Sequence, residues 1–283
     1  MVVRGRRTLL VGTLLCAAAS ASKARAQTLN EPRVNLPYVS AYGIGVLNDG
    51  DARINVLTIP VKVPLRRFST DRWGLRLRLT GSFGVYRLDR LEDLTLDRVR
   101  AYVVKPGLEL QIPLGPKLAL IPYLDAGVGR HLEHQQWAFV GDVGVRSEFV
   151  FPWQSAMVGI VPRLAYSTSR SADTTLNAGL PSAEVVFDLR HPLWFHLGRV
   201  EPDVGIYFRP AYSAAKVDFE PTTEVSRSTI TELEGGVSLG SCPPLKLWFI
   251  PLPRISVGYR WSNTGISGVR ITLGDRLLRC QTR

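Results

Sequence analysis

The chain has 283 residues, three cysteines and a formal net charge of +11 at pH 7. Residues 1–26 contribute five of the positive charges and no negative one, so the remainder carries +6. Because no basic helix, zinc-ligand spacing or aromatic-basic motif follows, the composition argues against nucleic acid as a partner. No hydrophobic run after residue 26 approaches the roughly 18 residues of a spanning helix.

The N-terminus has the pattern of a secretory signal peptide. Arg4, Arg6 and Arg7 precede the short apolar run TLLVGTLLCAAAS, which ends before Ala24-Arg25-Ala26. A basic region, an apolar region and an A-x-A site in this order predict export. We expect cleavage after Ala26.

Residues 73–85, WGLRLRLTGSFGV, alternate large apolar side chains with polar or small ones. At a period of two, Leu75, Leu77 and Leu79 line one face of a strand. Arg76 and Arg78 line the opposite face. One face therefore requires an apolar environment and the other a polar one.

The same alternation recurs along the chain and predicts twelve strands. In chain order they cover residues 38–47, 53–65, 73–87, 99–114, 118–129, 137–151, 156–168, 182–190, 203–213, 229–239, 253–262 and 266–274. An even number of consecutive antiparallel strands places both ends of the array on the same side.

The predicted connections differ between the two ends of the strands. One end carries the longest and most polar segments, STSRSADTTLNAGLP and SAAKVDFEPTTEVSRS, whereas the other carries short, proline-marked links such as PWQS. Long outer loops and short inner turns are typical of bacterial outer-membrane barrels, whose tilted strands need about 9–11 residues to cross.

The fold class that these features predict is all-β, a transmembrane antiparallel up-and-down β-barrel of about twelve strands. The leucines of 73–85 then face lipid and the arginines face the lumen. Its partners would be outer-membrane lipid and, during insertion, the barrel-assembly machinery. A soluble periplasmic lipocalin-like binding barrel remains an alternative, because its strands alternate in the same way.

The polar phase of the strands holds eleven basic and nine acidic side chains. Near-equal numbers suggest a paired network across the lumen, since an unpaired buried charge is costly. The predicted lumen-facing charges are Arg76, Arg78, Lys105, Glu109, Asp125, Asp142, Arg146, Glu148, Arg163, Glu184, Asp188, Arg209, Glu232, Glu234, Arg254 and Arg260.

Strands such as LRLRLTGSFGVY, VKPGLELQIPL and IPYLDAGVG, within an array of this size, resemble the solitary outer-membrane barrels related to autotransporter translocators. The resemblance covers residues 38–274 and implies a twelve-stranded barrel. Autotransporters carry a passenger and a helix that threads the barrel, but residues 27–37 are few and contain two prolines. The resemblance therefore implies a barrel without a passenger.

The domain organisation that follows has four parts: a cleaved signal peptide at 1–26, a short periplasmic segment at 27–37, the outer-membrane barrel at 38–274, and a periplasmic tail at 275–283.

An outer-membrane enzyme acting on lipid or peptide is the main rival class. Such an enzyme needs a serine or an acidic group beside a histidine base, and no His-x-Ser motif occurs. His131 and His134, with Glu133 between them, form only a weak metal-ligand pattern. We expect no catalytic residues, no metal and no cofactor.

Two cysteines, Cys242 and Cys280, remain after signal cleavage, and both fall on the periplasmic side of the predicted array. In an oxidising compartment such a pair is usually bonded, so we expect a Cys242–Cys280 disulfide. The expected function is that of a structural or narrow-pore barrel without catalysis, with an unidentified small solute as a candidate partner.

Overall fold

The computed structural model describes residues 44–49, 52–86, 99–132, 136–171, 177–196, 198, 200–214, 229–247 and 250–273. Nowhere in these ranges is there a helix with the length and apolarity needed to cross a membrane. The regular structure in these ranges is β-strand.

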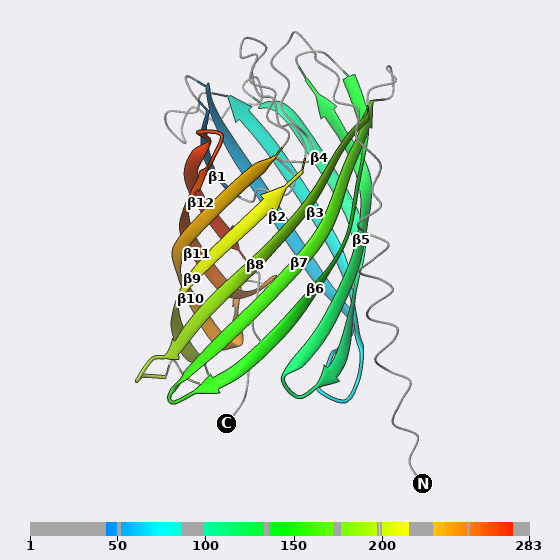
Figure 1. Cartoon of the computed structure of the whole chain (residues 1–283). Coiled ribbons are helices and arrows are strands. Elements are labelled where there is room, and N and C mark those ends of the chain that lie inside the picture. Colours follow the sequence, from blue (N-terminus) through cyan, green and yellow to red (C-terminus); the bar gives the residue numbers. More distant parts are fainter. Residues whose placement is uncertain are drawn as a thin grey trace.

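Twelve strands of the described chain close into a single barrel, in which each strand pairs with its neighbours in sequence and β1 pairs with β12 (Figure 1). All pairings between these described strands are antiparallel. The strands are β1 (Ile44–Asp49), β2 (Ala52–Arg66), β3 (Gly74–Tyr86), β4 (Val99–Gly115), β5 (Leu118–His131), β6 (Gln136–Trp153), β7 (Ala156–Ser171), β8 (Asn177–Pro192), β9 (Glu201–Ser213), β10 (Ile230–Leu247), β11 (Ile250–Ser262) and β12 (Ser267–Leu273). The predicted fold class and strand number are confirmed.

Three strand boundaries differ from the sequence prediction by five residues or more, and the others by at most three. The first strand begins at Ile44, and residues 38–43 lie outside the described chain. β8 begins five residues before the predicted start at 182. Pro181 is accommodated because residues 177–181 pair with β7 alone, whereas pairing with β9 starts at Ser182. A proline is tolerated where its nitrogen faces no partner strand.

β10 is also longer than predicted, running through the proline-containing stretch to Leu247. The register with β11 shifts between Gly240 and Leu245, and such an irregularity accommodates residues that cannot donate to the ladder. Cys242 therefore lies within β10 and not in the turn that the sequence predicted.

The two faces of the wall differ sharply in polarity. Leu124, Phe139 and Leu239 are each more than 60% exposed, and the outward apolar set continues around the barrel. Buried lysine, arginine, aspartate and glutamate side chains alternate with them on the inner side. This distribution is the reverse of a soluble barrel and fits an outer-membrane barrel, in which lipid covers the apolar face.

Two inward tyrosines fill space that glycines leave open, one on the neighbouring strand and one two strands away. A Cβ at Gly144 would lie 2.5 Å from the Tyr123 hydroxyl, and one at Gly258 would lie 2.2 Å from the Tyr207 hydroxyl. Tyr123 pairs with Gly144 in the ladder. The absent side chains let each ring lie against the wall, where it reaches charged partners.

The turn between β2 and β3 carries polar and aromatic contacts at one barrel end. Ser69 donates a hydrogen bond to the Asp71 carboxylate at 2.5 Å, which lowers the pKa of Asp71 below its ordinary value. Arg66 stacks on Trp73 with its guanidinium carbon 3.7 Å from the ring centre. Exposed tryptophans near strand ends, here Trp73, Trp137, Trp153 and Trp261, are typical of residues at a membrane interface.

Candidate functional site

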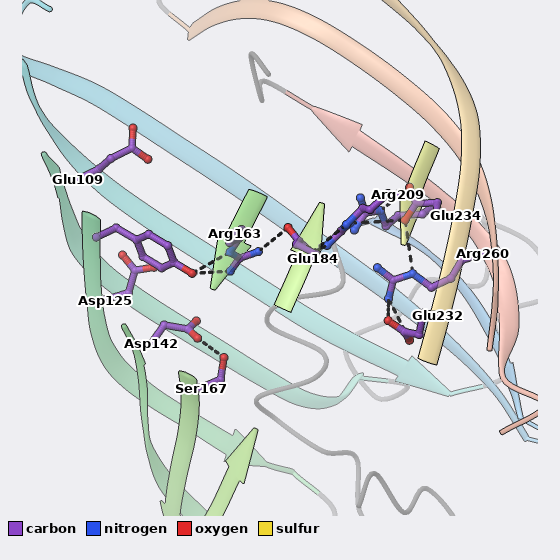
Figure 2. A network of polar contacts seen from close by, with 12 residues as sticks. Glu109, Asp125, Asp142, Arg163, Ser167, Glu184, Arg209, Glu232, Glu234 and Arg260 are labelled. Carbon is purple, nitrogen blue, oxygen red and sulfur yellow. Dashed lines mark hydrogen bonds and ion pairs between the residues drawn. The ribbon is translucent and has the colours of Figure 1, made fainter. Parts of the chain in front are cut away.

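The inner wall of the barrel is the richest assembly of charged side chains in the described chain. All sixteen charges that the sequence assigned to the lumen lie in described strands. Figure 2 shows part of their contacts, among them those that connect Arg163, Glu184, Arg209, Glu234, Arg260 and Glu232. Four further charges take part in the same contacts: Lys62, Arg190, Asp203 and Arg270.

Glu109 on β4 is surrounded by four cations. Arg76 Nη1 lies 3.2 Å from its carboxylate, Arg146 Nη2 3.5 Å, Arg78 Nη1 3.9 Å and Lys62 Nζ 4.0 Å. We call these five side chains the Glu109 cluster. They come from β2, β3, β4 and β6. All five face the lumen because side chains alternate between the two faces of each strand.

Two more ion pairs lie beside this cluster. Arg78 Nη2 contacts Asp125 on β5 at 3.1 Å. Lys105 on β4 pairs with Asp142 on β6, whose carboxylate also accepts a hydrogen bond from Ser167. In each pair the two residues are separated by one intervening strand. A long basic side chain can reach across that strand along the wall.

Tyr123 on β5 joins this part of the wall to the next. The guanidinium of Arg78 lies 4.4 Å from the centre of its ring, a cation–π contact. Its hydroxyl accepts hydrogen bonds from Arg163 Nε and Nη2, at 2.9 and 2.6 Å. Two arginines from β3 and β7 are thus held by one aromatic side chain.

From Arg163 the contacts continue strand by strand toward β12. Arg163 Nη1 donates to Glu184 on β8 at 3.3 Å, and Arg209 on β9 donates to the same carboxylate. Glu234 on β10 lies 3.5 Å from Arg209 Nη1. The remaining partners of this part are Glu232, Arg260, Arg270 and Tyr207.

A separate group lies closer to the short turns at the end of β8. Arg254 on β11 donates from both Nη atoms to Asp188 on β8, at 2.5 and 2.9 Å. Arg190 Nε is 3.3 Å from the same carboxylate, and its Nη1 is 3.8 Å from Asp203. Both Arg254 and Asp188 are buried.

Among the described residues, these ion pairs follow the wall and do not cross the lumen, where the sequence analysis expected a network across it. They join residues of one strand, of adjacent strands, or of strands two or three apart. Neighbouring strands lie about 4.8 Å apart, so a partner along the wall is nearer than one across a twelve-stranded barrel. The sequence analysis did not include three uncharged residues that take part in these contacts: Tyr123, Tyr207 and Ser167. Each lies an even number of positions from a predicted lumen-facing charge on its own strand, so its side chain is on the same face.

The structure also brings together a serine and a histidine that no local motif connects. Ser155, in the turn after β6, and His191, at the end of β8, are 3.0 Å apart between Oγ and Nε2. His191 Nδ1 donates to the Pro192 carbonyl at 2.7 Å, so a neutral ring accepts from Ser155. Both side chains are exposed, and the contact connects two turns at the barrel rim.

Of the remaining predicted residues, Cys242 is disulfide-bonded, whereas Cys280 lies outside the described residues, so their pairing stays a prediction. His134 and Glu133 are also outside the described ranges. Among the described side chains, no three of the metal-ligating types His, Cys, Asp and Glu are grouped to hold a metal ion.

No known protein family and no curated protein matches the chain. Among solved structures, the chain is similar to the beta domain of the Bordetella autotransporter BrkA. The match has a TM-score of 0.42 and 11% sequence identity, and covers 81% of this chain and 92% of that one.

Proposed function

We propose that this chain is an integral outer-membrane β-barrel that acts as a narrow, charge-lined pore and carries out no catalysis. The observation that carries the proposal is the inverted polarity of the closed wall, with charges inside and apolar side chains outside.

The outer surface argues against the soluble lipocalin-like alternative. A soluble barrel would expose Leu124, Phe139, Leu239 and many similar side chains to water around its whole circumference. Soluble monomers rarely expose contiguous apolar patches above a few hundred Å². Outer-membrane lipid is therefore the partner that this surface fits.

The inner surface favours a water-accessible lumen over a fully packed one. Arg76 and Arg163 bond to buried inward partners, yet 33% and 25% of their side chains are exposed. Twelve strands lie between the eight of filled barrels and the sixteen of wide porins. A narrow aqueous passage is consistent with both observations.

A purely structural barrel is the second candidate. It is favoured by the almost complete burial of Lys105, Glu234 and Arg254, which fill space at their level of the lumen. Planar-bilayer recording on refolded protein separates the two functions. Discrete channel steps are expected for the pore, and a silent bilayer containing correctly folded protein would favour the structural role.

The membrane orientation can be tested on intact cells. Protease should cleave within 215–228, which lies outside the described residues, and should spare the turn at 154–155 between β6 and β7. The purified protein should migrate faster on gels when unheated than when boiled. Cleavage restricted to 154–155 would reverse the proposed orientation.

The enzyme alternative can be tested at one pair of residues, because Ser155 and His191 have the geometry of a nucleophile and a base. We expect no hydrolysis of short-chain and phospholipid esters above that of a Ser155→Ala variant. Turnover by the unaltered protein that is lost in this variant would establish an esterase.

A further inference from the structure

We propose that the Glu109 cluster is a binding site for a small oxyanion, such as inorganic phosphate, on the lumen wall. The inference rests on the proposed pore function and deepens it, because an anion site in the passage would make permeation selective for anions.

The first observation is the local excess of positive charge. Lys62, Arg76, Arg78 and Arg146 all lie within 4.0 Å of the one Glu109 carboxylate. Arg78 and Arg146 also contact Asp125 and Glu148, at 3.1 and 3.6 Å. Among the described residues, four cations therefore face three carboxylates.

The excess belongs to this part of the wall. Of the twenty inner charges named above, all on described strands, ten belong to β8–β12, where five bases face five acids. The other ten belong to β2–β7, where six bases face four acids. Among these twenty side chains, the surplus of two bases thus lies on the half that contains Glu109.

The second observation is the difference in exposure between the cations and the acid that they surround. The Glu109 side chain is 1% exposed, whereas Lys62 is 19% and Arg76 33% exposed. Since the acid lies beneath the cations, the groups that a solute meets are the ammonium and guanidinium groups. In the Glu109 cluster, the charged groups that remain exposed are therefore positive.

The third observation concerns hydrogen-bonding capacity. A guanidinium has five N–H donors in a fixed fork that matches carboxylate and phosphate oxygens. Arg76 reaches Glu109 through Nη1, so one edge of the group serves the wall while the exposed part points away from it. An oxyanion there would receive charge-assisted hydrogen bonds and offset the repulsion among four neighbouring cations.

The test is phosphate binding by the full exported chain, refolded in lipid-free detergent so that no lipid phosphate competes. Thermal unfolding is followed by tryptophan fluorescence while potassium phosphate replaces potassium chloride at constant ionic strength. A ligand that binds the folded state raises Tm with its concentration. We expect the phosphate-dependent Tm shift to fall at least twofold in a Lys62→Gln/Arg76→Gln variant.

Two controls isolate the cluster. Arg76→Lys keeps the charge and should retain most of the shift, whereas Lys117→Gln removes a positive charge from the exposed β4–β5 turn and should leave it unchanged. If the double variant does not refold, Arg76→Gln alone replaces it. A Tm that phosphate does not raise in the unaltered protein, or an equal rise in the glutamine variants, would overturn the site.

Reversal potentials in a potassium chloride gradient then separate the two proposals. Anion preference that declines in Lys62→Gln/Arg76→Gln supports both. Phosphate binding by a barrel that never conducts would retain the anion site and refute the pore. A conducting barrel that binds no phosphate would retain the pore and refute the anion site.

Discussion

The inner wall has two halves that use the same residue types differently. On β8–β12 each base is matched by an acid, and the Arg254–Asp188 pair is almost entirely buried, at 1% and 0% exposure. On β2–β7 bases outnumber acids, and Arg76 and Lys62 remain in contact with the lumen. Buried ion pairs hold strands together, whereas cations that keep part of their side chain exposed can also attract a solute.

The largest expected effect is the loss of stability when an arginine of the β8–β12 half is replaced by alanine, compared with the same replacement in the β2–β7 half. Arg254→Ala leaves the Asp188 carboxylate buried with weaker compensation, which should cost about 3–5 kcal/mol. Arg76→Ala should cost about 1 kcal/mol or less, because the pair is partly exposed and Glu109 keeps three other cations. Urea unfolding in lipid vesicles gives both values, and equal losses would remove the distinction between the halves.

The expected Cys242–Cys280 disulfide would add a covalent constraint to the β8–β12 half. In the chain-entropy model a loop of about 38 residues is stabilised by roughly 3–4 kcal/mol. Reductant should lower the urea midpoint of the unaltered protein and leave that of a Cys242→Ser/Cys280→Ser variant unchanged. Mass spectrometry of non-reduced protein from the envelope would contradict the pairing if both thiols were free to alkylate.

A pair of adjacent glycines tests how tightly the β8–β12 half is packed. A Cβ at Gly236 would lie 2.3 Å from the Val257 carbonyl oxygen, whereas one at Gly235 would meet nothing within 4 Å. Gly236→Ala should therefore cost about 1–3 kcal/mol, and Gly235→Ala should be close to neutral. The difference in urea midpoint measures the close approach of β10 and β11, and identical midpoints would argue against it.

The smallest expected effect lies within the β2–β7 half, where Tyr123 on β5 connects Arg78 on β3 with Arg163 on β7. Tyr123→Phe removes the hydroxyl that accepts from Arg163 but keeps the ring beneath Arg78. The loss should be about 1.5–2 kcal/mol, at the low end of the range for a hydrogen bond to a charged group. Tyr166→Phe, on the outer face, is the matched control. If the two variants lost the same stability, the Tyr123 hydroxyl would add nothing to the contacts of the β2–β7 half.

The sequence by itself determined the fold class, the number of strands and the face of the wall on which each charge lies. Side chains alternate with a fixed period of two in any strand, so Leu77 and Arg78 must face opposite sides whatever the strand pairs with. The same rule failed at strand ends rich in glycine and proline, where β8 and β10 proved longer than the pattern indicated.

Only the tertiary structure decided which charges meet. Period two gives no information on how far one strand is shifted against the next, and a barrel fixes that shift only when it closes. The register brings Arg76 opposite Glu109 and Tyr123 opposite Gly144. It also places Ser155 beside His191, although 36 residues separate them. The grouping of four cations around Glu109 follows from that register, because composition fixes how many charges line the lumen but not their neighbours.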